Sequence, residues 1–393
     1  MTDMLLTFNA GSSTIKIGIF ELESGRPSRS GKAVVDLSRK PLTLEIEQDA
    51  ESTETPLATP ARSDLPELIR EVLGILGQHF PLDNMIAVGH RIVHGGDVFT
   101  GPVLLDAATI EKIDALTQLA PLHQPQALKL IRVMKELRPD LVQTGSFDTT
   151  FHATQSDLVR RYAIPREWHD QGVKRYGFHG LSYCHVARAL RERAPDIANG
   201  KVVIAHLGSG ASLCAIEGGE SRDTSMGFST LDGIPMATRP GALDPGVLLH
   251  LLGPLGKSLA QLEDMLYHRS GLLGLSGISG DIRTLQRSDA DEARQAIDVF
   301  ALRVAGEICR LASTLGGLDA LVFTAGIGEH QPEIRAAIVA HLSWIGVSLD
   351  ADANRRSAET IGGVDSRVAV LIIPTDEEQM IAEECMTARQ QQI

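Results

Sequence analysis

The chain has 393 residues, 43% of them hydrophobic, which is enough to bury a large core and favours two domains over one. Fifty acidic residues against 37 basic ones give a formal net charge of -13, and the basic residues form no run, so we expect no nucleic acid partner. The four cysteines are widely separated, no apolar run reaches roughly 18 residues, and the N-terminus lacks the pattern of a signal peptide, so we expect a cytoplasmic protein with no membrane partner.

At the N-terminus the sequence predicts a hairpin with a small polar tip. Met4–Phe8 is typical of a strand, Asn9–Ser13 of a turn, and Thr14–Phe20 of a second strand with its isoleucines on one face. The same strand, glycine turn and strand return at Val202–Ile216, about half a chain length later. This repeat predicts two related domains.

Two later segments show no helix or strand pattern. Glu47–Ser63 is rich in Thr, Pro, Ala and Glu without periodicity, so we expect a surface excursion within the first domain. Ser270–Ser279 is too glycine-rich for a helix and leads into Asp281–Arg283. This second segment could wrap a nucleotide or simply form a packed loop.

The C-terminal part alternates helices and strands. Apolar residues recur at helical spacing over Asp291–Leu315, and Leu318–Thr324 is typical of a buried strand. A glycine loop and a helix beginning near Pro332 follow that strand. Val368–Ile373 predicts another strand, which runs into a helix whose first turn is acidic. Strand, glycine loop and helix together suit the binding of phosphate or ribose.

Several short patterns bear on nucleotide and metal binding. Backbone N–H groups of a Gly/Ser turn can cradle phosphate, and Lys16 adds charge to the first turn, although each turn alone could be an ordinary hairpin. No G-x-G-x-x-G occurs, and Leu251 stands where a P-loop needs its first glycine, so neither of those nucleotide folds is expected. His90 and His94 are four residues apart, but Arg91 replaces the glutamate of H-E-x-x-H, which argues against zinc.

Phosphoryl transfer needs cations and hydrogen-bond donors around the transferring group. Arg91 and Arg239 lie beside glycines and can fork onto a carboxylate or phosphate, although a structural ion pair explains either one equally well. Asp148 can orient an arginine or a metal-bound water, or cap a turn. His179 can donate to the transferring group, but its local sequence alone favours a core histidine. Glu377 can reach a metal, or act only on the helix dipole.

Nine segments of the chain occur together in a characteristic order and form: Asn9–Ser13, Gly89–Gly96, Pro121–His123, Phe147–His152, Arg175–Gly180, His206–Gly210, Asp223–Gly227, Ser270–Gly274 and Phe323–Glu329. With them the chain resembles the acetate kinases over nearly its whole length. The resemblance implies an α/β fold of duplicated RNase H-like domains of the actin/sugar kinase/Hsp70 type, with a cleft between them, and a homodimer. The first domain would be residues 1–150 plus 375–393, and the second, nucleotide-binding domain residues 151–374.

The resemblance also implies a reaction, in which the γ-phosphoryl group of ATP is transferred reversibly to acetate with Mg²⁺ or Mn²⁺, giving acetyl phosphate and ADP. The implied catalytic residues are Asp148, His179 and Arg239, and the implied metal ligands are Asn9 and Glu377. Arg91 would bind the carboxylate, beside an acyl pocket of Val93, Leu122 and Phe178. The residues implied for ATP or ADP are Lys16, His206, Leu207, Gly208, Ser209, Gly210, Asp281, Ile282, Arg283, Gly326, Ile327, Gly328, Glu329 and His330.

Four single positions depart from the family pattern, and so does the segment Pro240–Asp244, which follows the implied catalytic arginine. Ser209, His330 and Asp376 stand where asparagine is usual, which leaves nucleotide affinity open. Thr230 stands where the acyl pocket usually has proline, which leaves the preferred acid open. A propionate or butyrate kinase is therefore the alternative within the family. A nucleotide-binding switch of the actin or Hsp70 type is the alternative from another functional class.

Overall fold

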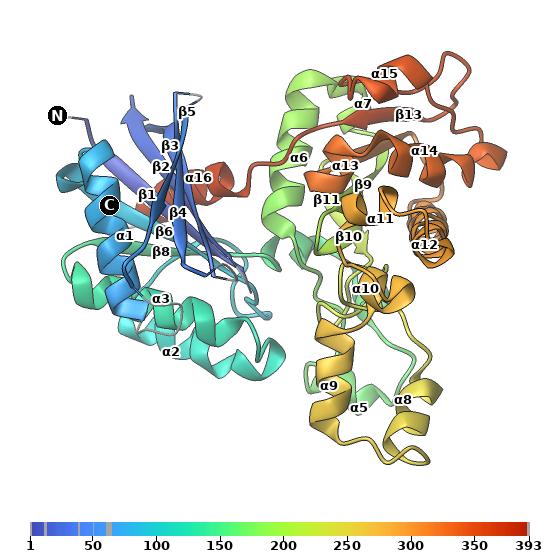
Figure 1. The fold of residues 1–393 in the computed structure, drawn as a ribbon, viewed down its shortest axis with the longest axis horizontal. Coiled ribbons are helices and arrows are strands. Elements are labelled where there is room, and N and C mark those ends of the chain that lie inside the picture. The colour runs from blue at the N-terminus through green and yellow to red at the C-terminus, as the bar shows by residue number, and fades with distance from the viewer. Residues whose placement is uncertain (1, 12–13, 38–39, 50, 60–64, 391–393) are drawn as a thin grey trace. The chain divides into compact units, whose positions relative to one another are not determined.

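Two compact units make up the chain in this computed structural model, which describes residues 2–11, 14–37, 40–49, 51–59 and 65–390 (Figure 1). Unit 1 consists of Met1–Thr150 together with Asp376–Ile393, and unit 2 of Phe151–Thr375. Within the described ranges, every helix is too short or too polar to cross a membrane.

Unit 1 is built on a mixed sheet of eight strands. They are β1 (Met4–Ala10), β2 (Thr14–Glu23), β3 (Arg26–Asp36), β4 (Thr43–Gln48), β5 (Glu51–Pro56), β6 (Met85–Ile92), β7 (Val103–Leu104) and β8 (Val142–Phe147). Their order is β5-β4-β3-β2-β1-β6-β8-β7. The central strands β1, β6 and β8 run parallel, and the remaining neighbours are antiparallel.

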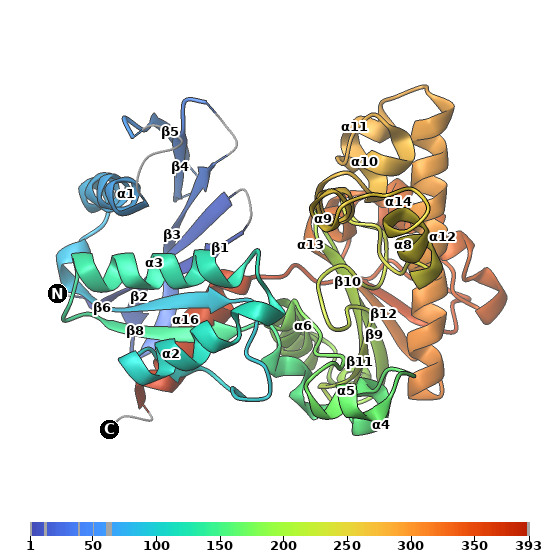
Figure 2. The same ribbon diagram turned by 90° about the horizontal axis from the view of Figure 1, so that it is seen from below.

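Helices cover both faces of this sheet (Figure 2). They are α1 (Leu65–His79), α2 (Ala107–Ala115), α3 (Gln124–Leu137) and α16 (Glu377–Gln390), with the short 3-10 helices η1 (Leu82–Asn84) and η2 (Thr117–Leu119). Successive side chains of a strand point to opposite faces. Accordingly, Leu6 and Phe8 of β1 belong to the core with α1 and α3, whereas Leu5 packs with Ala382 and Cys385 of α16.

Unit 2 contains a smaller sheet with the same core topology. Its strands are β9 (Lys201–Leu207), β10 (Ala211–Glu217), β11 (Glu220–Thr224), β12 (Ala320–Thr324) and β13 (Ala369–Ile372), in the order β11-β10-β9-β12-β13. Three antiparallel strands are followed by two parallel ones, as in β3-β2-β1-β6-β8 of unit 1. The expected duplicated α/β fold is therefore present.

The helices of unit 2 flank its sheet. They are α4 (Asp157–Arg160), α5 (Arg166–Asp170), α6 (Gly180–Arg193), α7 (Pro195–Ala198), α8 (Pro245–Leu252), α9 (Leu259–His268), α10 (Gly271–Ser276), α11 (Ile282–Gln286), α12 (Asp291–Leu315), α13 (Ala325–His330), α14 (Pro332–Ala340) and α15 (Ala351–Arg355), with η3 (Thr150–Thr154) at its start and η4 (Ser343–Ile345). Tyr183 and Leu190 of α6 pack on alternate residues of β9 such as Ile204, and α12 contacts β9, β10 and β11.

Most of the predicted elements are confirmed. Both hairpins form, as β1–β2 and β9–β10, and α12 begins and ends where the apolar periodicity does. Gly316 ends α12 in the left-handed region at φ 68, which a residue without a side chain adopts at little cost. The predicted strands before and after the glycine loop appear as β12 and β13.

Two predictions were wrong because tertiary contacts outweigh local composition, whereas the expected surface position of a third segment is confirmed by its exposed strand. The segment 270–279 contains α10, which begins at Gly271 (φ 61), includes Gly274 and is followed by Gly277 (φ 64). The predicted glycine loop after β12 is the helix α13, whose glutamate Glu329 accepts a hydrogen bond from the N–H of Ala325 (2.7 Å). The predicted surface excursion 47–63 contains β5, an exposed edge strand paired with β4; its last part, 60–63, lies outside the described residues.

Candidate active site

A group of polar side chains gathers in unit 1 at the carboxyl ends of its parallel strands. Asn9 lies near the end of β1, Arg91 near the end of β6, and Asp148 directly after β8, while Glu377 and Glu378 open α16. Because the carboxyl ends of parallel strands meet at one edge of a sheet, ligands usually bind there. Four segments that are remote in sequence thus contribute to one place.

Hydrogen bonds join this group into a network. The Arg91 guanidinium donates to Asp148 from Nε (3.0 and 3.2 Å) and from Nη2 (2.5 Å), and to Asn9 Oδ1 from Nη1 (3.0 Å). The Asn9 amide in turn donates to Glu377 (2.8 Å) and Glu378 (2.9 Å). Asp148 is only 1% exposed, so its charge is balanced by Arg91 rather than by water.

The electrostatics of the group favour a permanently charged arginine. Burial by itself would lower the pKa of Arg91, but the carboxylates of Asp148, Glu377 and Glu378 together raise it above its ordinary value. A fixed guanidinium among carboxylates can bind a further carboxylate or phosphate when a ligand or metal ion balances the negative charge.

The other predicted residues of unit 1 lie in nearby elements. Lys16 of β2 is paired with Asn9 across the hairpin, and its side chain is exposed. Val93 is buried directly after β6, and Leu122 is half-buried in the turn before α3. Ser12 and Ser13, which complete the predicted phosphate turn, lie outside the described residues.

His90 and His94 are both buried and hydrogen-bonded within unit 1. The imidazole of His90 is fully buried and hydrogen-bonded through Nε2 to Gln143 Oε1 (2.7 Å), and burial lowers its pKa to about 4. Burial also lowers the pKa of His94 to about 4, and its Nδ1 accepts from the N–H of Gly96 (2.9 Å). Among the described residues, no three His, Cys, Asp or Glu side chains are grouped so as to hold a metal ion.

In unit 2, His179 and Arg239 approach the same glycine. His179 precedes α6 with a left-handed backbone (φ 58), and its ring stacks on His206 with the centroids 4.3 Å apart. A Cβ atom added to Gly210 would lie 2.7 Å from Arg239 Nη2 and 3.4 Å from His179 Nε2. The glycine therefore leaves open a space that both nitrogen atoms border.

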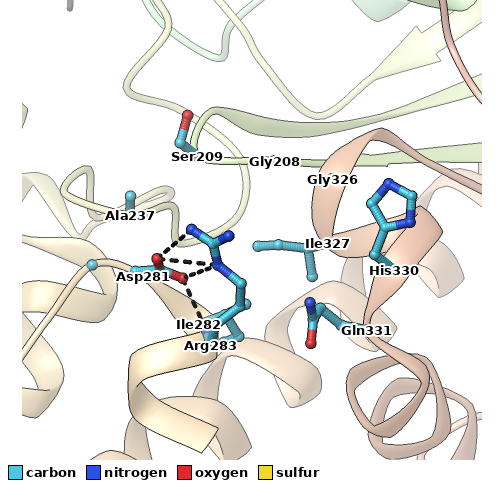
Figure 3. A pocket seen from close by; sticks show the side chains of 11 residues that line it. Gly208, Ser209, Ala237, Asp281, Ile282, Arg283, Gly326, Ile327, His330 and Gln331 are labelled. Carbon is cyan, nitrogen blue, oxygen red and sulfur yellow. Dashed lines mark hydrogen bonds and ion pairs between the residues drawn. The ribbon is translucent and has the colours of Figure 1, made fainter. Parts of the chain in front are cut away.

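A cavity of about 540 Å³ lies in the same unit (Figure 3). Eight of the residues predicted for the nucleotide line it: Gly208, Ser209, Asp281, Ile282, Arg283, Gly326, Ile327 and His330. Three further lining residues, Ala237, Gly280 and Gln331, were not predicted. The sequence signal for Gly280 was its position beside Asp281, and a Cβ atom there would approach Ala237 O to 2.8 Å.

Some predicted nucleotide residues support the cavity rather than line it. Glu329 accepts hydrogen bonds from the backbone N–H groups of Ala325 (2.7 Å) and Thr375 (3.2 Å). It therefore joins the first residue of α13 to the segment that follows β13. The fully buried Arg335 donates to the carbonyl oxygens of Gly328 (2.8 Å) and Glu329 (3.0 Å). His206, Leu207, Gly210, Gly328 and Glu329 lie outside the cavity lining, and Phe178 is buried before His179.

The positions that depart from the family pattern have clear local partners. Asp376 forms an ion pair with Arg29 (2.5 Å) and accepts from the N–H of Gln379 (2.9 Å), which fixes the start of α16. The carbonyl oxygen of Thr230 accepts from Arg239 Nη1 (2.9 Å). The main chain at position 230 therefore contributes to the orientation of Arg239.

Comparisons with known proteins identify the family of this chain. A sequence model of the acetokinase family matches residues 4–383. The acetate kinase of Nitrobacter hamburgensis is 46% identical over 98% of this chain and 96% of its own. The crystal structure of a propionate kinase from Francisella tularensis superposes with a TM-score of 0.91 at 33% identity, covering 98% of this chain and 99% of that one.

The crystal structure of the Porphyromonas gingivalis acetate kinase superposes with a TM-score of 0.88 at 32% identity, over 98% of this chain and 100% of that one. Sequence and fold thus agree over nearly the whole length of each protein. The chain belongs to the acetokinase family of phosphotransferases that act on a carboxyl group.

Proposed function

We propose that this protein catalyses the reversible transfer of the γ-phosphoryl group of ATP to acetate, giving acetyl phosphate and ADP. The observation that carries the proposal is the network of Asn9, Arg91, Asp148 and Glu377 at the carboxyl ends of the strands of unit 1. An ordinary nucleotide switch has no need for a half-buried arginine held among carboxylates at this place.

In this proposal Arg91 binds the carboxylate of the acid. Asp148 holds the guanidinium through three short contacts, so its orientation is fixed before the acid arrives. The family resemblance assigns Val93, Leu122 and Phe178 to the apolar surroundings of the acyl group. Asp148 lies beside the arginine that holds the reacting carboxylate.

The oxygen atoms of unit 1 suit a magnesium ion. Mg²⁺ prefers carboxylate and carbonyl oxygens. The amide nitrogen of Asn9 donates to the carboxylates of both Glu377 and Glu378, so these two carboxylates lie close to one another. We propose that Asn9 and Glu377 hold this ion, alone or through water. When bound, Mg²⁺ would neutralise the negative charge of the nucleotide phosphates.

We propose that the nucleotide occupies the cavity of unit 2. Its apolar walls, Ile282 and Ile327, suit the faces of an adenine ring, and its polar rim includes Ser209 and Arg283. Lys16 of unit 1 would face the phosphates. His179 and Arg239 would donate to the oxygens of the transferring phosphoryl group, whose charge is spread in the transition state.

A preference for propionate is the second candidate, because one of the solved structures similar to this chain is a propionate kinase. One methylene group in an apolar pocket changes discrimination by only about 1–3 kcal/mol, so both acids could react. A cytoplasmic location and a homodimeric assembly are further proposals, and they rest on the family resemblance alone.

The test is formation of acyl phosphate, trapped as hydroxamate, from ATP with acetate, propionate or butyrate, with and without Mg²⁺. We expect product with acetate in the presence of Mg²⁺, a raised KM for the acid in Arg91→Ala, and a lowered kcat in Arg239→Ala. Arg132→Ala is the matched control, because the exposed Arg132 of α3 forms an ion pair with Asp114 of α2 (2.7 Å). Absence of product with all three acids would refute the proposal.

A further inference from the structure

Ser212 of β10 lies between two side chains of unit 2. Its Oγ is 2.5 Å from the hydroxyl of Tyr183 on α6 and 2.8 Å from Nδ1 of His179. Tyr183 and Ser212 are both fully buried. The three groups therefore form a chain of hydrogen bonds that leads from the core of the unit to the histidine.

The chain has one favourable direction. In the described part of the molecule, the Tyr183 hydroxyl has Ser212 Oγ as its hydrogen-bond partner, and burial raises the pKa of Tyr183 well above its usual range. Tyr183 therefore stays protonated and donates a hydrogen bond to Ser212. A serine hydroxyl has one proton, which then points to Nδ1 of His179.

The other arrangements leave a buried proton without an acceptor. If Ser212 donated to Tyr183, the phenol proton would point into the core. If Ser212 accepted from both neighbours, its own proton would be unsatisfied. A buried polar group without a partner is unfavourable, so the first direction is the most stable.

This direction fixes the form of the histidine. A neutral imidazole that accepts at Nδ1 carries its proton on Nε2 and donates from there. Nε2 is the atom of His179 that, with Arg239 Nη2, borders the space left by Gly210. Stacking on His206 restrains the plane of the ring. Nε2 of His179 and Nη2 of Arg239 then both present N–H donors to the space beside Gly210.

We propose that Tyr183 and Ser212 are positioning residues that hold His179 in the Nε2–H form, so that the neutral ring donates to an oxygen of the transferring phosphoryl group. The part about the phosphoryl group rests on the proposed function. The Nε2–H form of His179 does not rest on the proposed function, and it can be measured without substrate.

The first experiment is NMR of protein labelled with ¹⁵N in histidine, at a pH where the ring is neutral. The signal of His179 is identified by its loss in His179→Gln. We expect a protonated Nε2 and an unprotonated Nδ1 in the unmodified protein, and a mixture of both forms in Ser212→Ala and Tyr183→Phe. Ser212→Thr, which keeps the hydroxyl, should retain the Nε2–H form.

Tyr176→Phe is the matched control, because Tyr176 is also buried but donates to the carbonyl oxygen of Gly172 (2.9 Å). Its His179 signal should be unchanged. In steady-state assays, kcat should fall about twofold or more in Ser212→Ala, with little change in either KM, because an even mixture of the two ring forms leaves half of the molecules without the donor to the transition state.

A proton on Nδ1 of His179 in the unmodified protein would overturn the proposal, as would an unchanged ring and unchanged kcat in both Ser212→Ala and Tyr183→Phe. Should Ser212→Ala fail to fold, Tyr183→Phe and the unmodified protein still decide the question. A protein that phosphorylates no acid but shows the Nε2–H form would refute the proposed function while leaving the hydrogen-bond chain intact.

Discussion

Acid should destabilise unit 1 through the buried imidazole of His90. The ring stacks on Phe8 and donates from Nε2 to Gln143 Oε1, while its Nδ1 has no hydrogen-bond partner among the described residues. Protonation would place a charge in the core with no acceptor for the new N–H. This is why burial lowers the pKa of His90 from 6.5 to about 4.

The direction and the size of the change in the free energy of unfolding follow from proton linkage. Between these two pKa values the unfolded chain binds more protons than the folded one, so stability present above pH 6.5 is lost as the pH falls toward 4. Between about pH 7.5 and about pH 5, the free energy of unfolding should fall by about 2 kcal/mol for this one group. The loss corresponds to about 4–8 °C in the melting temperature.

The assay compares melting temperatures across this pH range for the unmodified protein and for His90→Gln. Glutamine can still donate to Gln143 but does not titrate, so the variant should lose about 2 kcal/mol less on acidification. His79→Gln, at an exposed position at the end of α1, is the control. Equal pH dependence in His90→Gln and the unmodified protein would refute the reasoning.

Three further predictions concern buried charge and backbone strain. Arg91→Ala removes the ion pair of the buried Asp148 carboxylate, which should cost about 3–5 kcal/mol in chemical unfolding, and adding Asp148→Asn should recover part of the loss. Ala325 has a left-handed backbone at φ 64, so Ala325→Gly should stabilise the protein by about 1 kcal/mol, and a lower melting temperature would count against strain there. Arg335→Met removes the hydrogen bonds that hold the end of α13, so it should raise the KM for ATP but not for acetate; an unchanged KM for ATP would show that the cavity wall stands without them.

The sequence alone determined several regular elements and the family. Apolar runs located β1 and β9, alternation of apolar residues located β2, and helical periodicity located α12, because these patterns record which sides of each element are buried. The motif order was specific enough to indicate the acetate kinases, and the 46% identity to the Nitrobacter hamburgensis acetate kinase agrees with it.

Only the tertiary structure decided how the polar residues group together. Asn9 and Glu377 are 368 positions apart in the chain, and no local pattern reports that their side chains are hydrogen-bonded. The helix α10 was missed for a related reason: Gly271 is required by the close approach of Met236 O, a contact that composition cannot reveal. Periodicity carries information about one element at a time, whereas the site and the chain from Tyr183 to His179 depend on contacts between elements.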